Sequence, residues 1–150
     1  MPAGFHFRTA RAADFRALHA ACFASESPAS FGDAFRRALK WQQHGHCYWL
    51  VAETDATDNL IGCGQLLLYP YCAEIARLSV APPYQGKGIG TAMLRQLIDI
   101  ARSSGLPHVE IGIARENTRA QGLYQRLGFL IQRNLQLPGM TPSVILRKKL

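Results

Sequence analysis

The segment LSVAPPYQGKGIGTAMLRQLIDIA, residues 78–101, places three glycines just before a long run of apolar residues at helical spacing. Those glycines are Gly86, Gly88 and Gly90. Glycine weakens a helix interior, so such a cluster indicates unusual dihedral angles or the close approach of another molecule. A strand that ends at Val80 and a helix that begins near Gly90 would leave free backbone N–H groups at the positive end of a helix dipole. The segment therefore predicts a phosphate-binding loop.

Two familiar nucleotide-binding loops do not fit this segment. A Walker loop needs G-x-x-x-x-G-K-[ST], but Ala81 stands at its first glycine and Gly88 at its hydroxyl residue. A Rossmann loop needs G-x-G-x-x-G, and Thr91 or Met93 stands where the third glycine should be. Glu110 follows at the distance of a ribose-binding acid, but it lies inside a strand pattern. The loop therefore belongs to another class.

Length and composition favour one domain over residues 1–150. The chain is 48% hydrophobic and 18% charged, as in ordinary globular proteins. It contains no apolar run near the roughly 20 residues of a membrane span, and its first fifteen residues lack the apolar centre of a signal peptide. We expect a cytoplasmic protein that does not bind membranes.

The net charge of +7 is compatible with a polyanionic partner. The basic residues are spread from Arg8 to Lys149 and form no stripe with interleaved aromatic residues, which argues against nucleic acid. A small polyanionic ligand fits this distribution better.

The cysteines and histidines predict no metal site. HGHC at 44–47 is followed by no second ligand pair at zinc-finger spacing. The cysteines form no C-x-x-C pair, and we expect all four to stay reduced as structural thiols: Cys22, Cys47, Cys63 and Cys72.

Hydrophobic periodicity predicts alternating strands and helices. The order of strand, helix and strand around the glycines implies a parallel pair with a right-handed crossover. The expected result is a mixed α/β sheet with helices on both faces. Strands are expected over 5–10, 47–54, 59–69, 73–80, 108–114, 129–137 and 143–150, and helices over 12–26, 28–44, from about 90 to 104, and 118–128.

Two motifs resemble the GNAT superfamily of N-acetyltransferases, which binds acetyl-coenzyme A. Gln85, Gly88 and Gly90 fit the pyrophosphate motif Q-x-x-G-x-G. ENTRAQGLYQRLGF at 116–129 is similar to the second signature, N-x-x-A-x-x-L-Y-x-x-L-G-F, in register at Asn117, Ala120, Leu123, Tyr124, Leu127, Gly128 and Phe129. The resemblance implies a mixed sheet of about seven strands, splayed between the fourth and fifth by a bulge, with about four helices on both faces. It also implies that the two N-terminal helices, which carry no motif, shape the acceptor site.

The resemblance also implies a site for acetyl-CoA as co-substrate, without a metal. Backbone groups of Leu78, Ser79 and Val80 would pair with the pantetheine arm as an extra strand. The loop would bind the pyrophosphate through its N–H groups, with added charge from Lys87, and its residues are Gln85, Gly86, Lys87, Gly88, Ile89, Gly90 and Thr91. The remaining coenzyme contacts would be Asn117, Ala120 and Tyr124, although Asn117 could equally be a helix cap.

Acetyl transfer needs a deprotonated amine, an oxyanion donor and an acid for the leaving thiolate. Tyr124 matches the family position whose phenol protonates the coenzyme sulfur, and its alternative role is a packed aromatic. A backbone N–H near Leu78 or Val80 would stabilise the oxyanion.

The general base has several candidates. Glu74 lies eleven residues before Gln85, the spacing of a catalytic glutamate in some family members, and we expect it near the mouth of the splayed strands. Other members use a water chain. Glu110 and Glu26 are the competing carboxylates.

The resemblance implies an N-acetyltransferase that moves the acetyl group of acetyl-CoA to a primary amine of a small molecule or peptide by direct attack in a ternary complex. Because dimers are common in the family, a homodimer is a candidate state, but the sequence does not determine the oligomeric state. The alternatives are a non-catalytic acetyl-CoA-binding regulatory module and a basic nucleic-acid-binding domain. A cluster of Glu26, Asp33 and Glu74 could attract a cationic acceptor, but the acceptor's identity is not determined by the sequence.

Overall fold

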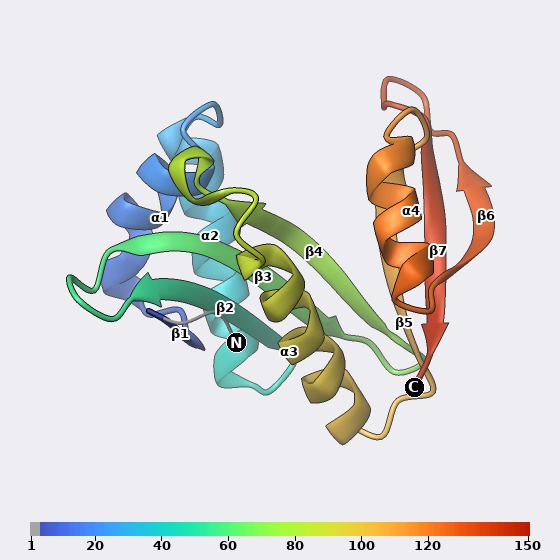
Figure 1. The fold of residues 1–150 in the computed structure, drawn as a ribbon, viewed down its shortest axis with the longest axis horizontal. Coiled ribbons are helices and arrows are strands. Elements are labelled where there is room, and N and C mark those ends of the chain that lie inside the picture. Colours follow the sequence, from blue (N-terminus) through green and yellow to red (C-terminus); the bar gives the residue numbers. More distant parts are fainter. Residues whose placement is uncertain (1–3) are drawn as a thin grey trace.

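The computed structural model describes residues 4–150 and forms one mixed seven-stranded sheet in the order β1-β2-β3-β4-β5-β7-β6 (Figure 1). Its strands are β1 (Phe5–Thr9), β2 (Cys47–Thr54), β3 (Leu60–Leu68), β4 (Ala73–Val80), β5 (His108–Ala114), β6 (Leu130–Leu135) and β7 (Ser143–Lys149). Its helices are the short η1 (Ala12–Asp14) and η2 (Pro82–Tyr84), and α1 (Phe15–Cys22), α2 (Pro28–Gln43), α3 (Ile89–Ser103) and α4 (Thr118–Arg126). The predicted mixed sheet with four main helices is confirmed.

The first predicted helix is shorter than expected. The prediction ran from 12 to 26, whereas α1 ends at Cys22 and Phe23 leaves the helical region with φ −133° and ψ 31°. The next helix then begins with Ser27 as its N-cap, whose hydroxyl accepts a hydrogen bond from the Ser30 N–H, and Pro28 at the first helical position. Apolar spacing alone did not mark this turn.

Helices cover both faces of the central strands, as predicted. On β2, Trp49 and Val51 pack with α1 and α2, while Leu50 and Ala52 pack on the other face with residues of α3. Successive side chains of a strand point to opposite faces, so this strand is buried on both sides. α1 and α2 therefore lie on one face, and α3 lies on the other.

β4 and β5 are splayed apart, as the family resemblance implies. Their parallel pairing covers only Ala73–Ile75 against Val109–Ile111. Beyond these residues β4 stays with β3, while β5 continues beside β7. Figure 1 shows β4 and β5 close together at the lower right and diverging upward, with α4 on the β5 side of the opening. The sheet thus contains a wedge-shaped gap.

A bulge in β4 accompanies the splay. The pairs Gln65↔Ala76 and Cys63↔Ser79 span two steps on β3 but three on β4. Arg77 has φ +51°, a left-handed conformation that L-residues rarely adopt. The extra residue bends the strand and turns the edge of β4 away from β5.

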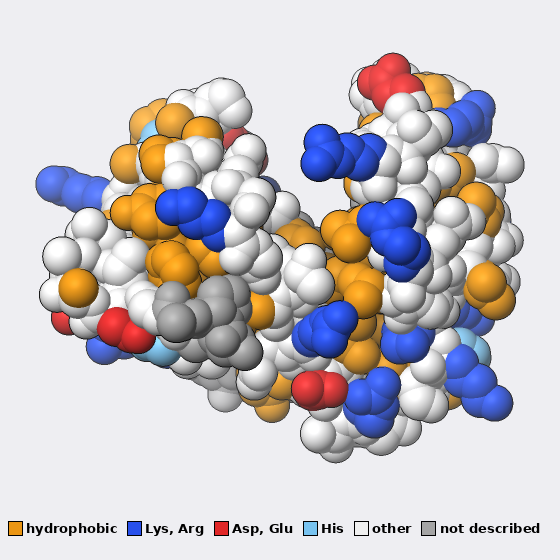
Figure 2. Space-filling model, in the orientation of Figure 1, with side chains coloured by type: hydrophobic (Ala, Val, Ile, Leu, Met, Phe, Trp, Pro, Cys, Tyr) orange, Lys and Arg blue, Asp and Glu red, His pale blue; other side chains and the backbone are white. Residues whose placement is uncertain are grey.

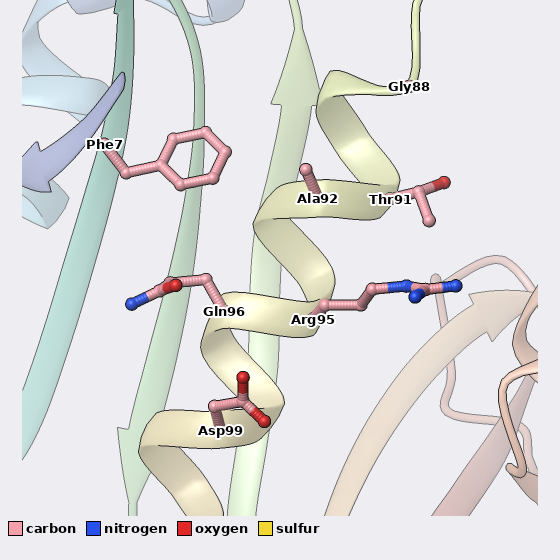
Figure 3. A pocket seen from close by; sticks show the side chains of 7 residues that line it. All are labelled: Phe7, Gly88, Thr91, Ala92, Arg95, Gln96 and Asp99. Carbon is pink, nitrogen blue, oxygen red and sulfur yellow. The ribbon is translucent and has the colours of Figure 1, made fainter. Parts of the chain in front are cut away.

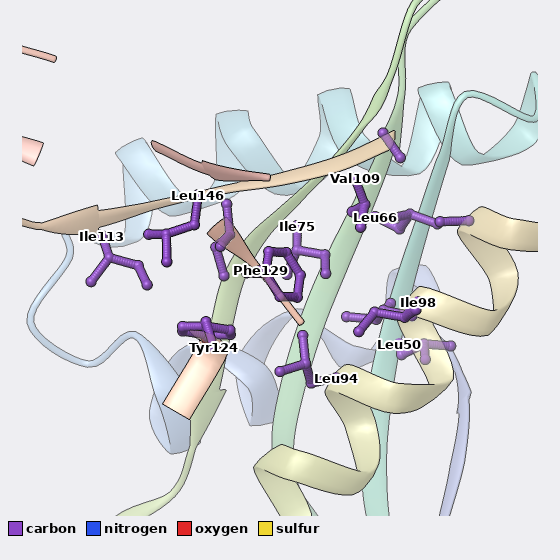
Figure 4. Close-up of a cluster of buried hydrophobic side chains, with 14 of the residues drawn as sticks. Leu50, Leu66, Ile75, Leu94, Ile98, Val109, Ile113, Tyr124, Phe129 and Leu146 are labelled. Carbon is purple, nitrogen blue, oxygen red and sulfur yellow. The ribbon is translucent and has the colours of Figure 1, made fainter. Parts of the chain in front are cut away.

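A shared core connects the two sides of the gap. Figure 4 shows Ile75 of β4, Leu94 of α3 and Val109 of β5 in one buried cluster with Tyr124 and Phe129. The rings of Tyr124 and Phe129 meet edge to face, with centroids 5.6 Å apart. α3 and α4 are therefore held against the sheet by the same apolar contacts.

The structure also shows the state of the cysteines and the character of the helices. All four cysteines are free, and Cys47 and Cys63 are buried. Within residues 4–150, no helix is long and apolar enough to cross a membrane.

Candidate active site

The loop before α3 presents backbone donors at a helix N-terminus. Gly86 and Gly88 have φ +75° and +81°, which glycine adopts without a steric cost. The helix begins with the Ala92 N–H donating to the Gly88 carbonyl at 3.0 Å. Across the described part of the chain, no group accepts a hydrogen bond from the N–H groups of residues 86–91. They are therefore available to an anion.

The other predicted loop residues have distinct roles. The Gln85 side-chain amide donates to the Val80 carbonyl at 2.9 Å and ties the loop to the end of β4. The Lys87 ammonium lies 5.5 Å from the Tyr84 ring centre. A Cβ on Gly90 would contact only Val80 Cγ2, at 3.6 Å, so the protein's own packing does not require this glycine. The conformational need for glycine is clear at Gly86 and Gly88.

A surface hollow of about 520 Å³ lies along the outer side of α3. In Figure 3, Phe7 and Ala92 lie across it from each other, and Arg95 points away from Phe7. The hollow meets the predicted loop only at its upper end, through Gly88 and Thr91. It does not reach the gap between β4 and β5.

A second cavity, of about 320 Å³, fills that gap. The space-filling view shows a deep notch between the two halves of the molecule, with hydrophobic side chains on its inner walls (Figure 2). Four predicted site residues line the cavity, namely Leu78, Asn117, Ala120 and Tyr124. Seven further residues were not predicted: Ile75, Ala76, Arg77, Ile111, Gly112, Ile113 and Ala114.

Beyond Ile75, the edge of β4 that faces the cavity has no strand partner among residues 4–150. Ser79 and Val80 pair with β3 on one side, and β4 pairs with β5 only as far as Ile75. Of the three predicted backbone contacts, Leu78 also lines the cavity with its side chain. An extended ligand could therefore add to this edge as another strand would.

Tyr124 reaches the cavity from α4. The residue is 7% exposed, and among residues 4–150 its hydroxyl has no hydrogen-bond partner. Burial raises the pKa of this phenol. The site therefore holds a protonated phenol whose hydroxyl is free to bond a ligand.

Asn117 is a helix cap that also lines the cavity. Its side-chain oxygen accepts a hydrogen bond from the Ala120 N–H at 3.1 Å, which confirms the capping alternative. Its amide nitrogen is not used by the cap.

Two of the three candidate base carboxylates are paired with arginine. Glu26 contacts the Arg77 guanidinium at 3.2 and 3.4 Å. Glu110 accepts a hydrogen bond from Arg147 Nε at 2.7 Å and lies 3.4 and 3.5 Å from the nitrogens of Arg133. Burial acts to raise the pKa of Glu110, but the hydrogen bonds from these arginines hold that pKa below its usual range. Both carboxylates therefore already take part in ion pairs.

Of the three candidate bases, Glu74 is the one without an ion pair among the described residues. It lies opposite Glu110 in the parallel register and is half-buried. Burial first, and then the negative charge of Glu110, raise the pKa of the Glu74 carboxyl. Glu74 was expected near the mouth of the splay, but it lies where the strands still pair, one residue before Ile75 of the cavity lining. The bulge opens the gap only beyond this point.

A possible metal-ligand group lies outside this site. Ligand atoms of His6, Glu53 and Asp58 lie within 4.8 Å of one another. Glu53 already pairs with Arg8, and His6 with Asp55. Because these side chains already pair with other residues, the group does not indicate a metal-binding site.

The sequence matches a known family and several known proteins. The model of the acetyltransferase (GNAT) family matches residues 12–129. Mycothiol acetyltransferase of Beutenbergia cavernae is 37% identical over 83 residues, which cover 54% of this chain and 27% of that enzyme. N-alpha-acetyltransferase RimI of Mycobacterium tuberculosis is 40% identical over 60 residues, covering 40% of this chain and 36% of that protein. The chain thus spans well under two thirds of these relatives.

Solved structures share the fold over nearly the whole chain. The PaiA N-acetyltransferase of Thermoplasma acidophilum, in complex with coenzyme A, has a TM-score of 0.74 at 21% identity. The match covers 97% of this chain and 99% of that one. Spermidine N-acetyltransferase of Vibrio cholerae, in complex with CoA and spermine, has a TM-score of 0.77 at 23% identity, covering 97% of this chain and 95% of that one. With the family model matching most of the sequence, the chain belongs to the acetyltransferase (GNAT) family.

Proposed function

We propose that this protein transfers the acetyl group of acetyl-CoA to a primary amine of a small molecule or peptide, by direct attack in a ternary complex. The observation that carries the proposal is the Tyr124 hydroxyl, which lies unbonded in a cavity between the unpaired edge of β4 and α4. Beside this edge, the loop at 86–91 offers its free N–H groups. Acetyl-CoA carries a pyrophosphate and, further along the same molecule, a thioester arm. The loop N–H groups suit the pyrophosphate, and the cavity beside β4 suits the thioester arm.

The proposed site gives each part of the coenzyme a place. The pyrophosphate binds the loop N–H groups, with Lys87 nearby and Gln85 fastening the loop to β4. The pantetheine arm extends along the edge of β4 beside Leu78. The side chains of Asn117 and Ala120 border the arm from the α4 side.

The proposed reaction forms a C–N bond to the acceptor amine and breaks the C–S bond of the thioester. The amine nitrogen attacks the thioester carbonyl, a backbone N–H near Leu78 or Val80 stabilises the oxyanion, and the C–S bond then breaks. The leaving thiolate takes the Tyr124 proton. Glu74 takes the amine proton, directly or through one water, because it is the candidate carboxylate without an arginine partner.

The test combines binding with turnover. Calorimetric titration should give saturable acetyl-CoA binding, and a screen of amines, amino acids and peptides should release free thiol together with acetylated product. Binding without release for any acceptor would support a coenzyme-binding regulatory module. Absence of both would contradict the proposed function.

A further inference from the structure

The face of the sheet opposite α3 is open at the splay. α1 and α2 pack mainly against β3 and β2, and the described residues place no helix over this face of β5 and β7. Core residues Ile75, Ile111 and Leu146 point toward α3 and α4, so their strand neighbours point to the open face. Those neighbours are Glu74, Ala76, Glu110, Gly112, Ile145 and Arg147.

An acceptor can reach the cavity from this open face. Ala76 and Gly112 lie on it and also line the cavity, and their small side chains leave the gap between β4 and β5 unblocked. A molecule that approaches here passes over Glu74 and over the ion pairs around Glu110.

Most of the charges around this approach neutralise one another. Arg77 pairs with Glu26 at 3.2 Å, and Arg147 donates to Glu110 at 2.7 Å. Arg133 contacts the already satisfied Glu110 only at 3.4 and 3.5 Å, and its side chain is 51% exposed. Of these described residues, Glu74 keeps an unpaired carboxylate and Arg133 keeps a weakly engaged guanidinium.

The strand register fixes how far apart these two groups lie. Glu74, Glu110 and Arg147 form one row across β4, β5 and β7. Arg133 of β6 starts opposite Ile145, which pairs with Gly112 of the cavity lining, and its guanidinium extends back to Glu110. Because neighbouring strands lie about 4.8 Å apart, Arg133 can place its guanidinium roughly 5–10 Å from the Glu74 carboxylate.

We propose that the acceptor is an amine that also carries a carboxylate, such as an amino acid or short peptide, and that Arg133 binds this carboxylate. The inference rests on the proposed acetyl transfer. A guanidinium offers a planar fork of donors that matches a carboxylate. The acceptor amine then lies toward Glu74. A polyamine has no group for Arg133 and is repelled by it.

Matched acceptors test this assignment. Each pair is an amino acid and its amide, for example 4-aminobutanoate and 4-aminobutanamide, with spermidine as the polyamine. The wild type should show kcat/KM roughly 10- to 100-fold higher for the acids, the effect of a charge-assisted hydrogen bond. Arg133→Gln should remove this preference by lowering kcat/KM for the acids while leaving the amides unchanged.

A control variant separates local recognition from net charge. Arg37→Gln on α2 removes the same charge from an exposed residue and should keep the preference for acids. Equal kcat/KM for acid and amide in the wild type, a preference that survives in Arg133→Gln, or an equal loss for both members of a pair would each overturn the carboxylate site while acetyl transfer stands. Failure to acetylate any amine would overturn both proposals together.

Discussion

Tyr124 combines two properties that a proton donor needs. Its ring is held edge to face against Phe129, and its hydroxyl reaches the cavity without a bonding partner among residues 4–150. Burial raises the pKa of the phenol, which keeps it protonated at neutral pH. A thiolate formed in the cavity would be more strongly basic than in water for the same reason, so burial shifts the pKa values of proton donor and acceptor in the same direction.

Removal of the Tyr124 hydroxyl should separate chemistry from binding. Tyr124→Phe keeps the ring against Phe129, so acetyl-CoA affinity should stay close to the wild type while kcat falls on the order of 10² to 10⁴. Tyr48→Phe, on β2 and outside the cavity lining, serves as the matched control. Full turnover in Tyr124→Phe, measured where chemistry is rate-limiting, would leave this tyrosine as a packing residue only.

The pH dependence should identify the base. A catalytic carboxylate must be ionised, so activity is lost as the pH falls through its folded-state pKa, and the raised pKa of Glu74 shifts that limb to higher pH. Glu74→Gln should lower kcat/KM by roughly 10² or more and abolish the limb. Glu110→Gln should retain the limb but move it to lower pH, since the negative charge of Glu110 contributes to the raised pKa of Glu74. An unchanged rate and limb in Glu74→Gln would place the base elsewhere.

For single residues, the sequence motifs identified several that line the cavity, but they did not identify the arginines that pair with the candidate carboxylates. Tyr124, Asn117 and Ala120 of the second signature line the cavity, together with Leu78 of the strand before the glycine loop. The arginines around Glu110 could not be predicted, because they become its neighbours only through the strand order β5-β7-β6. The pairing of Glu26 with Arg77 likewise depends on how α1 and α2 pack.

Among the elements, β4, the glycine loop and α3 act as one unit. β4 provides the unpaired edge, Gln85 ties the loop to the end of the strand, and α3 contributes its N-terminus. The left-handed conformation at Gly88, the N-cap, sets the direction of the first free N–H groups. Substitution there should therefore affect both folding and anion binding.

Two alanine substitutions can distinguish these effects. Gly88 and Gly105 have nearly the same φ, +81° and +82°, at opposite ends of α3. Each Gly→Ala change should lower the free energy of unfolding by about 1–2 kcal/mol through backbone strain. Only Gly88→Ala should also weaken acetyl-CoA binding, by 10-fold or more in calorimetry. Equal affinity in the two variants would contradict the phosphate-loop assignment.

The elements themselves were largely predictable. Periodicity gave β2, β4 and β5 with correct ends because their alternating or continuous apolar runs are bounded by polar turns. The bulge also leaves a signal, since apolar residues fall at Ala73 and Ile75 and then shift phase to Leu78 and Val80. How soon β4 and β5 separate is not visible in either strand, because it depends on contacts with β3, α3 and β7.

For the whole molecule, an ion-pair network fixes the edge of the sheet. Arg8 of β1 donates to Asp14 at 2.8 Å and to Glu53 of β2 at 2.8 Å. Burial acts to raise the pKa of Asp14, but hydrogen bonds from Arg8 and the Arg11 N–H lower it, and the bond from Arg8 lowers the pKa of Glu53. Their stabilising contribution is complete above about pH 5 and is lost as the pH falls through the lowered folded-state values.

Arg8→Gln should weaken the whole fold at neutral pH. It leaves two nearly buried carboxylates without their arginine, so the free energy of unfolding should fall by on the order of 3 kcal/mol at pH 7. The loss should shrink toward pH 3, where these carboxylates become protonated in the unfolded chain and in the variant, which lacks the arginine that lowers their pKa. Urea unfolding between pH 3 and 7 measures both effects. Arg36→Gln, which breaks an exposed pair with Asp33, should change little at any pH.

Because β4 and β5 pair over only three residues, a coenzyme bound between them would add to the stability of the fold. Along the gap the sheet consists of a four-stranded and a three-stranded part, joined by pairing over Ala73–Ile75. A pantetheine arm bonded along β4 would fill the position of a missing strand there. A ligand that binds only the folded chain adds about 2.7 kcal/mol of stability at a hundredfold excess over Kd. If the protein binds acetyl-CoA as proposed, its melting temperature should therefore rise with the concentration of acetyl-CoA.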